Sequence, residues 1–448
     1  MNEATAQTTT LKRIFATGSF AKNWAYLFTS SVFSQALGMI SLIRVARVLA
    51  PAGYGYFNIV QTSAGMGMVV AGLGMRNVII RACARNPESS KSLYMTVLSV
   101  RFLFSLAVGM GIMLYSFLSP HVLPIALSGF AIMLLFGQIM WDTTESVSFG
   151  LQRMEFSSRT TTIGSAIWLI WVWCVPLSVL TVAAISFSFA LLQILKAITL
   201  SYQLRRVIPY VHSLERSNLK KDALSLIITS LPFFWLLLLE TMQGDLSVLI
   251  LAQRSGPEQV GLFNVGFRLL RPLRLLFLTN ISVLYPYLSK VKQENPAQYM
   301  RAIERVLKTT LIVGSLSAFI ISLLRTEVVR LLFGEKYSGS ADALAYQCWY
   351  INLWAIMIII GTSLLASDRQ RLWAVLTTVY TIFVLPIIWF TAAHGATVLA
   401  SGIAVAIAAN LIFIWPFFKN RLPSKFQSRD IIRPFVVLGI AILSSWLM

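Results

Sequence analysis

Seven basic side chains lie inside long apolar runs of the sequence, where charged residues are otherwise rare. Three of them, Arg268, Arg271 and Arg274, follow one another at helical spacing. A charged side chain at membrane depth costs about 2.5–3.5 kcal/mol on insertion scales, so these three should not face lipid. Because guanidinium groups match phosphate oxygens in geometry, the sequence predicts a basic internal site for an anionic substrate that carries phosphate.

The other four basic residues are candidates for the same substrate-binding site: Arg44, Arg47, Arg101 and Lys196. Arg44 and Arg47 are three positions apart and share one face of a helix. Arg44, Arg101 and Lys196 also lie near the ends of their apolar runs, so they can instead extend to the lipid headgroups. Both interpretations stay open for these three residues.

Acidic residues inside the apolar runs are fewer, and Glu240 and Asp245 are the pair nearest in sequence to the three arginines. Each is a candidate for binding a coupling proton or sodium ion, and each is also a candidate for ion pairing with the arginines. Asp142 and Glu145 lie at the inner end of another predicted span.

The sequence has none of the motifs GxxxxGK[ST], HExxH or GxSxG, and no predicted loop is long enough to be a folded domain outside the membrane. It therefore indicates no enzyme and no cofactor. Three cysteines lie far apart without a CxxC pair, so no disulfide framework and no metal site is indicated.

The composition is that of a polytopic membrane protein. Hydrophobic residues make up 57% of the 448 residues, charged residues 12%, and the mean hydropathy is +0.73. We predict an all-α fold with about twelve transmembrane helices. The predicted spans are Trp24–Leu49, Tyr56–Leu73, Leu93–Leu118, Val122–Trp141, Ile163–Thr181, Val182–Tyr202, Ala223–Ala252, Leu262–Tyr285, Leu307–Leu324, Leu344–Ala366, Leu372–Ala393 and Thr397–Phe418. A short thirteenth run, Phe435–Leu447, spans, lies in the interface or packs on the bundle.

The net charge of +20 reflects membrane orientation and not nucleic-acid binding. With the N-terminus inside, the inner segments hold 26 Lys and Arg residues and the outer segments four. Both ends of the twelve-helix core should therefore be cytoplasmic.

A repeated stretch divides the chain into two lobes. LAPAGYGYFN at Leu49–Asn58 and SGPEQVGLFN at Ser255–Asn264 share four identities, each pair 206 positions apart. The expected organisation is a cytoplasmic tail (1–22), a six-helix N-lobe (23–203), a basic cytoplasmic linker (204–222), a six-helix C-lobe (223–418) and a basic segment with the short apolar run (419–448).

Four motifs resemble one known family. RVLAPAGYGYFNIV at Arg47–Val60 is similar to the first-hairpin signature of polysaccharide-transport flippases, and Gly244–Leu269 resembles their seventh-to-eighth-helix hairpin. LLFGEKY at Leu331–Tyr337 and GLGMRNVIIR at Gly72–Arg81 resemble two further elements of that family. The family belongs to the multidrug/oligosaccharidyl-lipid/polysaccharide (MOP) exporter superfamily.

This resemblance implies two lobes around a central cavity that opens alternately to each side of a bacterial plasma membrane. It implies a polyprenyl-diphosphate-linked oligosaccharide as substrate, for O-antigen, capsule or exopolysaccharide assembly, and membrane lipids and polysaccharide assembly proteins as partners. It assigns no role to any single arginine. The alternatives are a multidrug or lipid II exporter of the same superfamily and, from a different class, a membrane enzyme that polymerises or ligates glycans.

Overall fold

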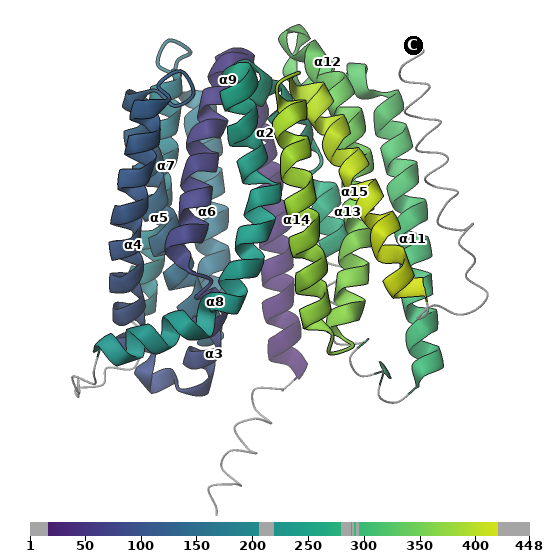
Figure 1. Ribbon diagram of the computed structural model, residues 1–448. Helices are drawn as coiled ribbons and strands as arrows, with labels where there is room; N and C mark the ends of the chain where they lie inside the picture. The colour runs from purple at the N-terminus through teal and green to yellow at the C-terminus, as the bar shows by residue number, and fades with distance from the viewer. Residues whose placement is uncertain (1–16, 206–218, 279–287, 289–290, 293–294, 420–448) are drawn as a thin grey trace, which may run out of the picture. The chain divides into compact units, whose positions relative to one another are not determined.

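A computed structural model describes residues 17–205, 219–278, 288, 291–292 and 295–419 (Figure 1). The predicted run Phe435–Leu447 and most of the linker lie outside the described residues. Within the described residues the chain is helical and has no β-strand, which confirms the all-α fold class. The long helices are α2 (Thr17–Gly72), α4 (Ser90–Leu118), α5 (Ile125–Gly150), α6 (Met154–Cys174), α7 (Val182–Arg205), α8 (Leu219–Gln243), α9 (Asp245–Leu269), α11 (Pro296–Leu323), α13 (Ala341–Leu365), α14 (Gln370–Ala392) and α15 (Ala396–Lys419).

Nine helical segments of the described chain are long and apolar enough to cross a membrane. Two of them, Phe28–Gly72 and Leu224–Leu269, are about twice the length of one crossing and each holds two predicted spans or parts of them. The shorter elements between the long helices are α3 (Arg76–Arg85), η1 (Pro87–Ser89), α12 (Arg325–Phe333) and η2 (Glu335–Ser340).

The boundaries of three predicted spans were wrong. The predicted fifth span, Ile163–Thr181, is helix α6, which ends at Cys174 because Val175 precedes Pro176 and takes an extended conformation. The predicted seventh span is divided at Gly244, where α8 ends and α9 begins. The predicted eighth span is interrupted at Leu270, two residues before Pro272.

The described residues fall into two compact units that divide the chain differently from the predicted lobes. Unit 1 lies within Met1–Val48 and Ser63–Leu238, and unit 2 within Leu49–Thr62 and Leu239–Met448. Helix α2 therefore starts in unit 1, contributes its middle segment to unit 2 and returns to unit 1. The predicted lobe and linker boundaries stay a prediction.

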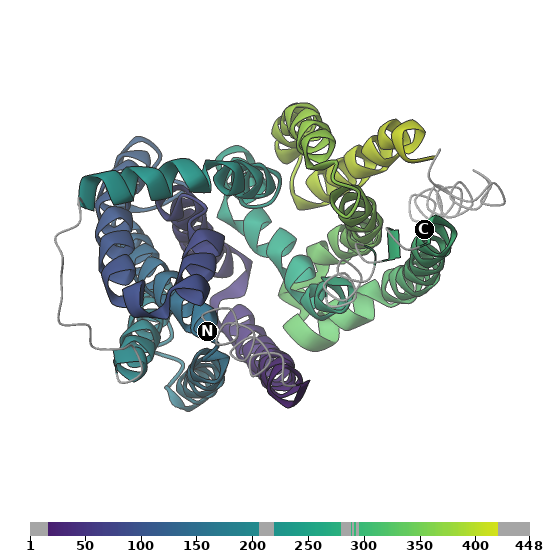
Figure 2. The same cartoon turned by 90° about the horizontal axis from the view of Figure 1, so that it is seen from below.

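Unit 1 is a bundle in which α5 packs most extensively against α7 and also contacts α3, α4 and α6. The blue helices of this bundle are seen end-on in Figure 2. A buried cluster that includes Met75, Ile79 and Val147 joins α3 to α5. Gly150 lies against the backbone of Ile80, so the short helix α3 is held tightly against the end of α5.

Unit 2 is organised around α13, the most thoroughly buried of its long helices, which contacts α9, α11, α14 and α15. Two buried amide side chains of α13 lie against glycines of neighbouring helices. Gln347 faces Gly266 of α9 and donates a hydrogen bond to the Phe263 carbonyl at 2.9 Å, and Asn352 faces Gly314 of α11. Because glycine lacks a side chain, these helices approach closely enough for the amides to fit.

The two copies of the repeated stretch adopt the same backbone conformation. Helix α2 is interrupted at Ala50 (φ 56°, ψ 173°), and α9 is interrupted at the matching Gly256 (φ 84°, ψ 173°). In each copy the asparagine eight residues later, Asn58 or Asn264, donates from its side chain to the carbonyl four residues before it. The repeat inferred from four identities is therefore also a repeat of conformation.

Candidate functional site

A basic cluster in unit 2 gathers the three arginines that the sequence singled out. Arg268 lies in the last turn of α9, and Arg271 and Arg274 lie in a helical stretch, 271–278, that begins after the break at Leu270. Proline fits the first turn of a helix, where its missing N–H costs no hydrogen bond, so Pro272 is placed where a new helix starts. The arginines are therefore on two consecutive helical segments and not on one continuous helix.

Arg268 is held by neutral groups. Its Nη2 donates to Oε1 of Gln61 at 2.6 Å and lies 3.3 Å from Oδ1 of Asn58. Asn58 is fixed in turn because its Nδ2 donates to the Tyr54 carbonyl at 2.7 Å. The Tyr54 ring is fully buried and lies within electrostatic range of the Arg268 and Arg271 guanidinium groups. Because amide oxygens carry no net charge, the hydrogen-bond partners of Arg268 do not compensate the positive charge of its guanidinium.

The other two arginines of the cluster differ in their partners. Nη2 of Arg274 forms an ion pair with Oε1 of Glu240 at 3.2 Å, and its guanidinium lies 4.5 Å from the centre of the Trp354 ring. Arg271 is exposed and has no ion pair or hydrogen bond with the described residues. One guanidinium of the cluster is thus neutralised by a carboxylate and another is open.

Asp245, the first residue of α9, lies within electrostatic range of all three arginines and of Glu240. With Glu240 it supplies two negative charges against three positive ones, so the cluster carries a net charge of about +1 when every group is ionised. The structure thus shows ion pairing for Glu240 and a place for Asp245 beside the same cluster. Whether either residue binds a coupling ion stays a prediction.

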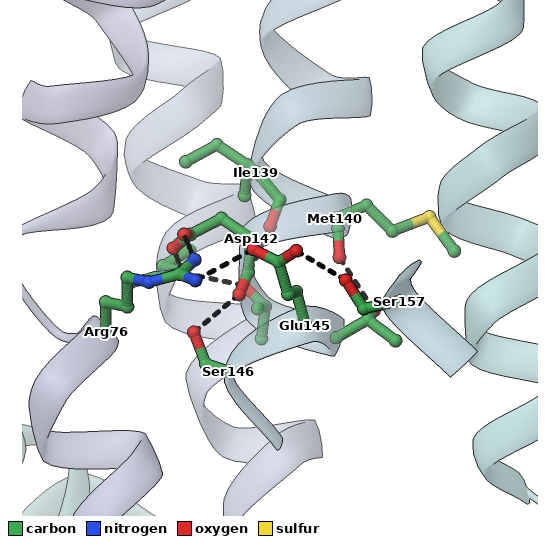
Figure 3. Close-up of polar contacts among 10 residues, drawn as sticks. Arg76, Ile139, Met140, Asp142, Glu145, Ser146 and Ser157 are labelled. Atoms are coloured by element: carbon green, nitrogen blue, oxygen red, sulfur yellow. Dashed lines mark hydrogen bonds and ion pairs between the residues drawn. The ribbon is translucent and has the colours of Figure 1, made fainter. Parts of the chain in front are cut away.

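A second group of charges lies inside unit 1, at the end of α5 (Figure 3). Arg76 bridges two carboxylates: Nη1 contacts Oδ1 of Asp142, and Nη2 lies 2.8 Å from Oε2 of Glu145. Burial lowers the pKa of the Arg76 guanidinium, but the two carboxylates outweigh this effect, so the pKa is raised above its ordinary value. Ser157 of α6 donates to the other oxygen of Glu145 at 2.6 Å.

Arg101 completes this group from α4. Its side chain is 1% exposed, and Nη1 donates to Oδ2 of Asp142 at 2.8 Å and to Oγ1 of Thr143 at 2.9 Å. Arg101 was predicted as a substrate-binding candidate, and the structure places it in a buried ion pair inside unit 1. A buried ion pair of this kind fixes α4 against α5, and its arginine is not accessible to a substrate.

The remaining predicted residues, Arg44, Arg47 and Lys196, lie in unit 1. Arg44 lies over the Trp173 ring, with 5.2 Å from its Cζ to the ring centre, and Arg47 is exposed. Lys196 of α7 lies over the Trp141 ring, with 4.6 Å from Nζ to the ring centre. The sequence missed the contributions of Gln61 and Asn58; the only signal was that Asn58 is one of the four identities of the repeat.

Solved structures of transporters share this fold. The lipid II flippase MurJ in an inward closed conformation is 14% identical with a TM-score of 0.68, over 93% of this chain and 92% of MurJ. An inward-facing multidrug resistance MATE family transporter is 14% identical with a TM-score of 0.60, over 87% and 94%. A MOP superfamily transporter from Pyrococcus furiosus, described by the reverse polarity of its binding pocket, is 15% identical with a TM-score of 0.55, over 89% and 95%.

The chain therefore has the helical fold of these membrane transporters. Residues 20–292 match the model of the family described as polysaccharide biosynthesis protein, and the chain belongs to that family. No curated protein matches the sequence. The resemblance stated from the motifs is confirmed.

Proposed function

We propose that this protein is a flippase that moves a polyprenyl-diphosphate-linked oligosaccharide from the cytoplasmic to the outer leaflet of the bacterial plasma membrane by alternating access. The observation that carries the proposal is the excess of positive charge in the arginine cluster of unit 2. The family match supports a role in polysaccharide biosynthesis, and the likeness to transporters supports movement of a substrate without bond chemistry.

The charge balance of the cluster favours a diphosphate group as the ligand. Arg271 has donors to spare, and Arg268 is oriented by Gln61 and Asn58 without being neutralised. A diphosphate offers several oxygens to two guanidinium groups and makes bidentate pairs with them. Arg274, already paired with Glu240, would set the position of its neighbours or exchange its carboxylate partner for phosphate.

The alternatives are separated by charge and by chemistry. An exporter of cationic drugs needs an acidic site, whereas the cluster here carries about +1. A lipid II exporter would bind the same diphosphate, so it differs from the proposal in the group that the diphosphate carries. A glycan polymerase or ligase would need an acid or base presented to a glycosidic bond.

The orientation and the coupling belong to the same proposal. The partition of 26 inner against four outer basic residues supports a cytoplasmic location for both ends of the twelve-helix core. Glu240 and Asp245 are the proposed coupling residues of unit 2, because they lie beside the arginines that would receive the anion. Binding of a cation at these carboxylates would free the arginines for phosphate.

The test is surface polysaccharide made by cells that depend on this protein. In the Arg271→Ala, Arg274→Ala double variant we expect the protein to accumulate and surface polysaccharide to fall at least about tenfold, as for the loss of one charged hydrogen-bonding contact. The matched control is the Arg325→Ala, Arg330→Ala double variant, whose arginines lie in ion pairs on α12. Normal polysaccharide from the first variant would show that the cluster does not bind the substrate.

A further inference from the structure

Lys196 is the one lysine among the seven basic residues inside the predicted spans; the other six are arginines. A guanidinium stays protonated in proteins, whereas an ammonium group releases its proton when its surroundings favour the neutral amine. Among these seven residues, Lys196 alone is therefore able to change its charge during a transport cycle.

The side chain of Lys196 lies in a place built by three helices. Its aliphatic part passes over Gly164 of α6, where an added Cβ would come 2.7 Å from the lysine Cδ. Its Nζ donates to Oε1 of Gln193 on α7 at 3.1 Å and lies 4.6 Å from the centre of the Trp141 ring of α5. A neutral amide and an aromatic face stabilise the ammonium weakly, and neither fixes it in the charged form.

The carboxylates near Lys196 are already engaged. Glu145 of α5 is within electrostatic range, but its two oxygens are bound by Arg76 and by Ser157. Asp142 is bound by Arg76 and Arg101. The remaining charged residues of α6 and α7 lie near the start of α6 (Glu155 and Arg159) and at the end of α7 (Arg205).

At this end of α5, Asp142 and Glu145 are thus paired with Arg76 and Arg101, and Lys196 makes no ion pair with the described residues. We propose that Lys196 is a proton-binding group of the transport cycle. The neutral amine takes a proton from water onto the Nζ lone pair on one side of the membrane and returns it to water on the other. Only N–H bonds form and break, and the charge inside unit 1 changes by one.

The alternative is that Lys196 is a fixed cation that contacts the anionic substrate, as the sequence suggested. The two roles make opposite demands on an arginine at this position. An arginine keeps a fixed charge and would preserve an anion contact, but it would abolish a group that must lose its proton. The comparison of Lys196→Arg with Lys196→Met therefore separates them.

Trp141 provides a direct readout, because indole emission responds to a charge at 4.6 Å. The purified full-length protein is titrated from about pH 6 to pH 10.5, a range that reaches the ordinary lysine pKa and covers pKa values below it. Subtracting the Trp141→Phe signal isolates the emission of this residue. We expect a single-proton step that is lost in both Lys196→Arg and Lys196→Met and kept in Lys308→Met, whose lysine is exposed and paired with Glu304.

This titration uses no glycan, so its outcome is independent of the proposed substrate. A step that persists in either folded Lys196 variant, or no step in the unaltered protein, would overturn the proposal. The melting temperature of each Lys196 variant shows whether that variant is folded. One folded variant is enough for the test. In cells, both variants should lose surface polysaccharide; wild-type amounts from Lys196→Arg would show that a fixed charge is enough and would overturn it as well.

Discussion

Gly55 lies directly against the backbone of Pro257, so that a Cβ atom at Gly55 would overlap the proline carbonyl oxygen. The relationship is reciprocal, because a Cβ atom at Gly261 would overlap the carbonyl oxygen of Pro51. Gly55 and Gly261 are matching positions of the repeat, and so are the two prolines. The two copies thus pack against each other, with the glycine of each copy in contact with the proline backbone of the other.

Substitution of either glycine should therefore destabilise unit 2. In Gly55→Ala and Gly261→Ala the added methyl meets backbone and cannot be accommodated by a change of rotamer, so we expect a loss of about 1–3 kcal/mol. The measurement is the melting temperature in detergent. Gly111→Ala is the matched control, because no atom lies within 4 Å of its added Cβ. Equal melting temperatures for all three variants would contradict the close packing.

The ion-pair group of unit 1 predicts an asymmetry between two acidic residues. Asp142→Asn leaves the buried Arg101 without a carboxylate and should destabilise the protein by about 3–5 kcal/mol. Glu155→Gln removes a 3.5 Å pair with the largely exposed Arg153 and should cost under about 1 kcal/mol. Thermal unfolding of both variants checks this difference. If Asp142→Asn unfolds at the same temperature as Glu155→Gln, the group does not stabilise the bundle.

The sequence was sufficient for the fold class, because a run of some twenty apolar residues has few alternatives to a membrane-spanning helix. The sequence was a less reliable guide to the positions at which helices end, because local backbone conformation determines them. Cys174 ends α6 although the apolar run continues beyond it, and Gly244 separates α8 from α9 inside one predicted span. Hydropathy reports burial in lipid and carries little information on where a helix turns.

The candidate site was predicted in part. The arginine cluster followed from the cost of charge in lipid, and its neighbours Glu240 and Asp245 followed from sequence proximity. Gln61 and Asn58 could not be found in this way, because they lie about 200 positions from Arg268 and are ordinary polar residues. The partition of the arginines between ion pairs and neutral partners, as for Arg101, also depends on tertiary contacts.

Coupling through the carboxylates of unit 2 is testable by removing their charge. If Glu240 or Asp245 binds a coupling cation, Glu240→Gln and Asp245→Asn should accumulate but lose most of the surface polysaccharide. If the acids serve only to pair with arginine, the variants should accumulate poorly because a charge loses its partner. Quantifying protein and polysaccharide in the same cells distinguishes the two roles, and normal amounts of both would exclude coupling through these residues.

The proposed orientation predicts where a reporter will be active. An enzyme that works only outside the cytoplasm should be active when fused after Pro120 or Gly256 and silent after Ser217 or Asn295. The physical reason is the 26-to-four partition of basic residues between the two sides. The reverse pattern at two of these four sites would overturn the orientation.

The most direct test of the account is translocation itself, measured with purified protein in liposomes. The probe is a polyprenyl-diphosphate-linked oligosaccharide that is labelled on the sugar and quenched by a reagent that cannot cross the membrane. The account predicts that the unaltered protein moves the label between leaflets, that Arg271→Ala slows this movement at least about tenfold, and that Arg330→Ala does not. Equal rates for Arg271→Ala and the unaltered protein, or no protein-dependent movement of the diphosphate-linked probe, would contradict it.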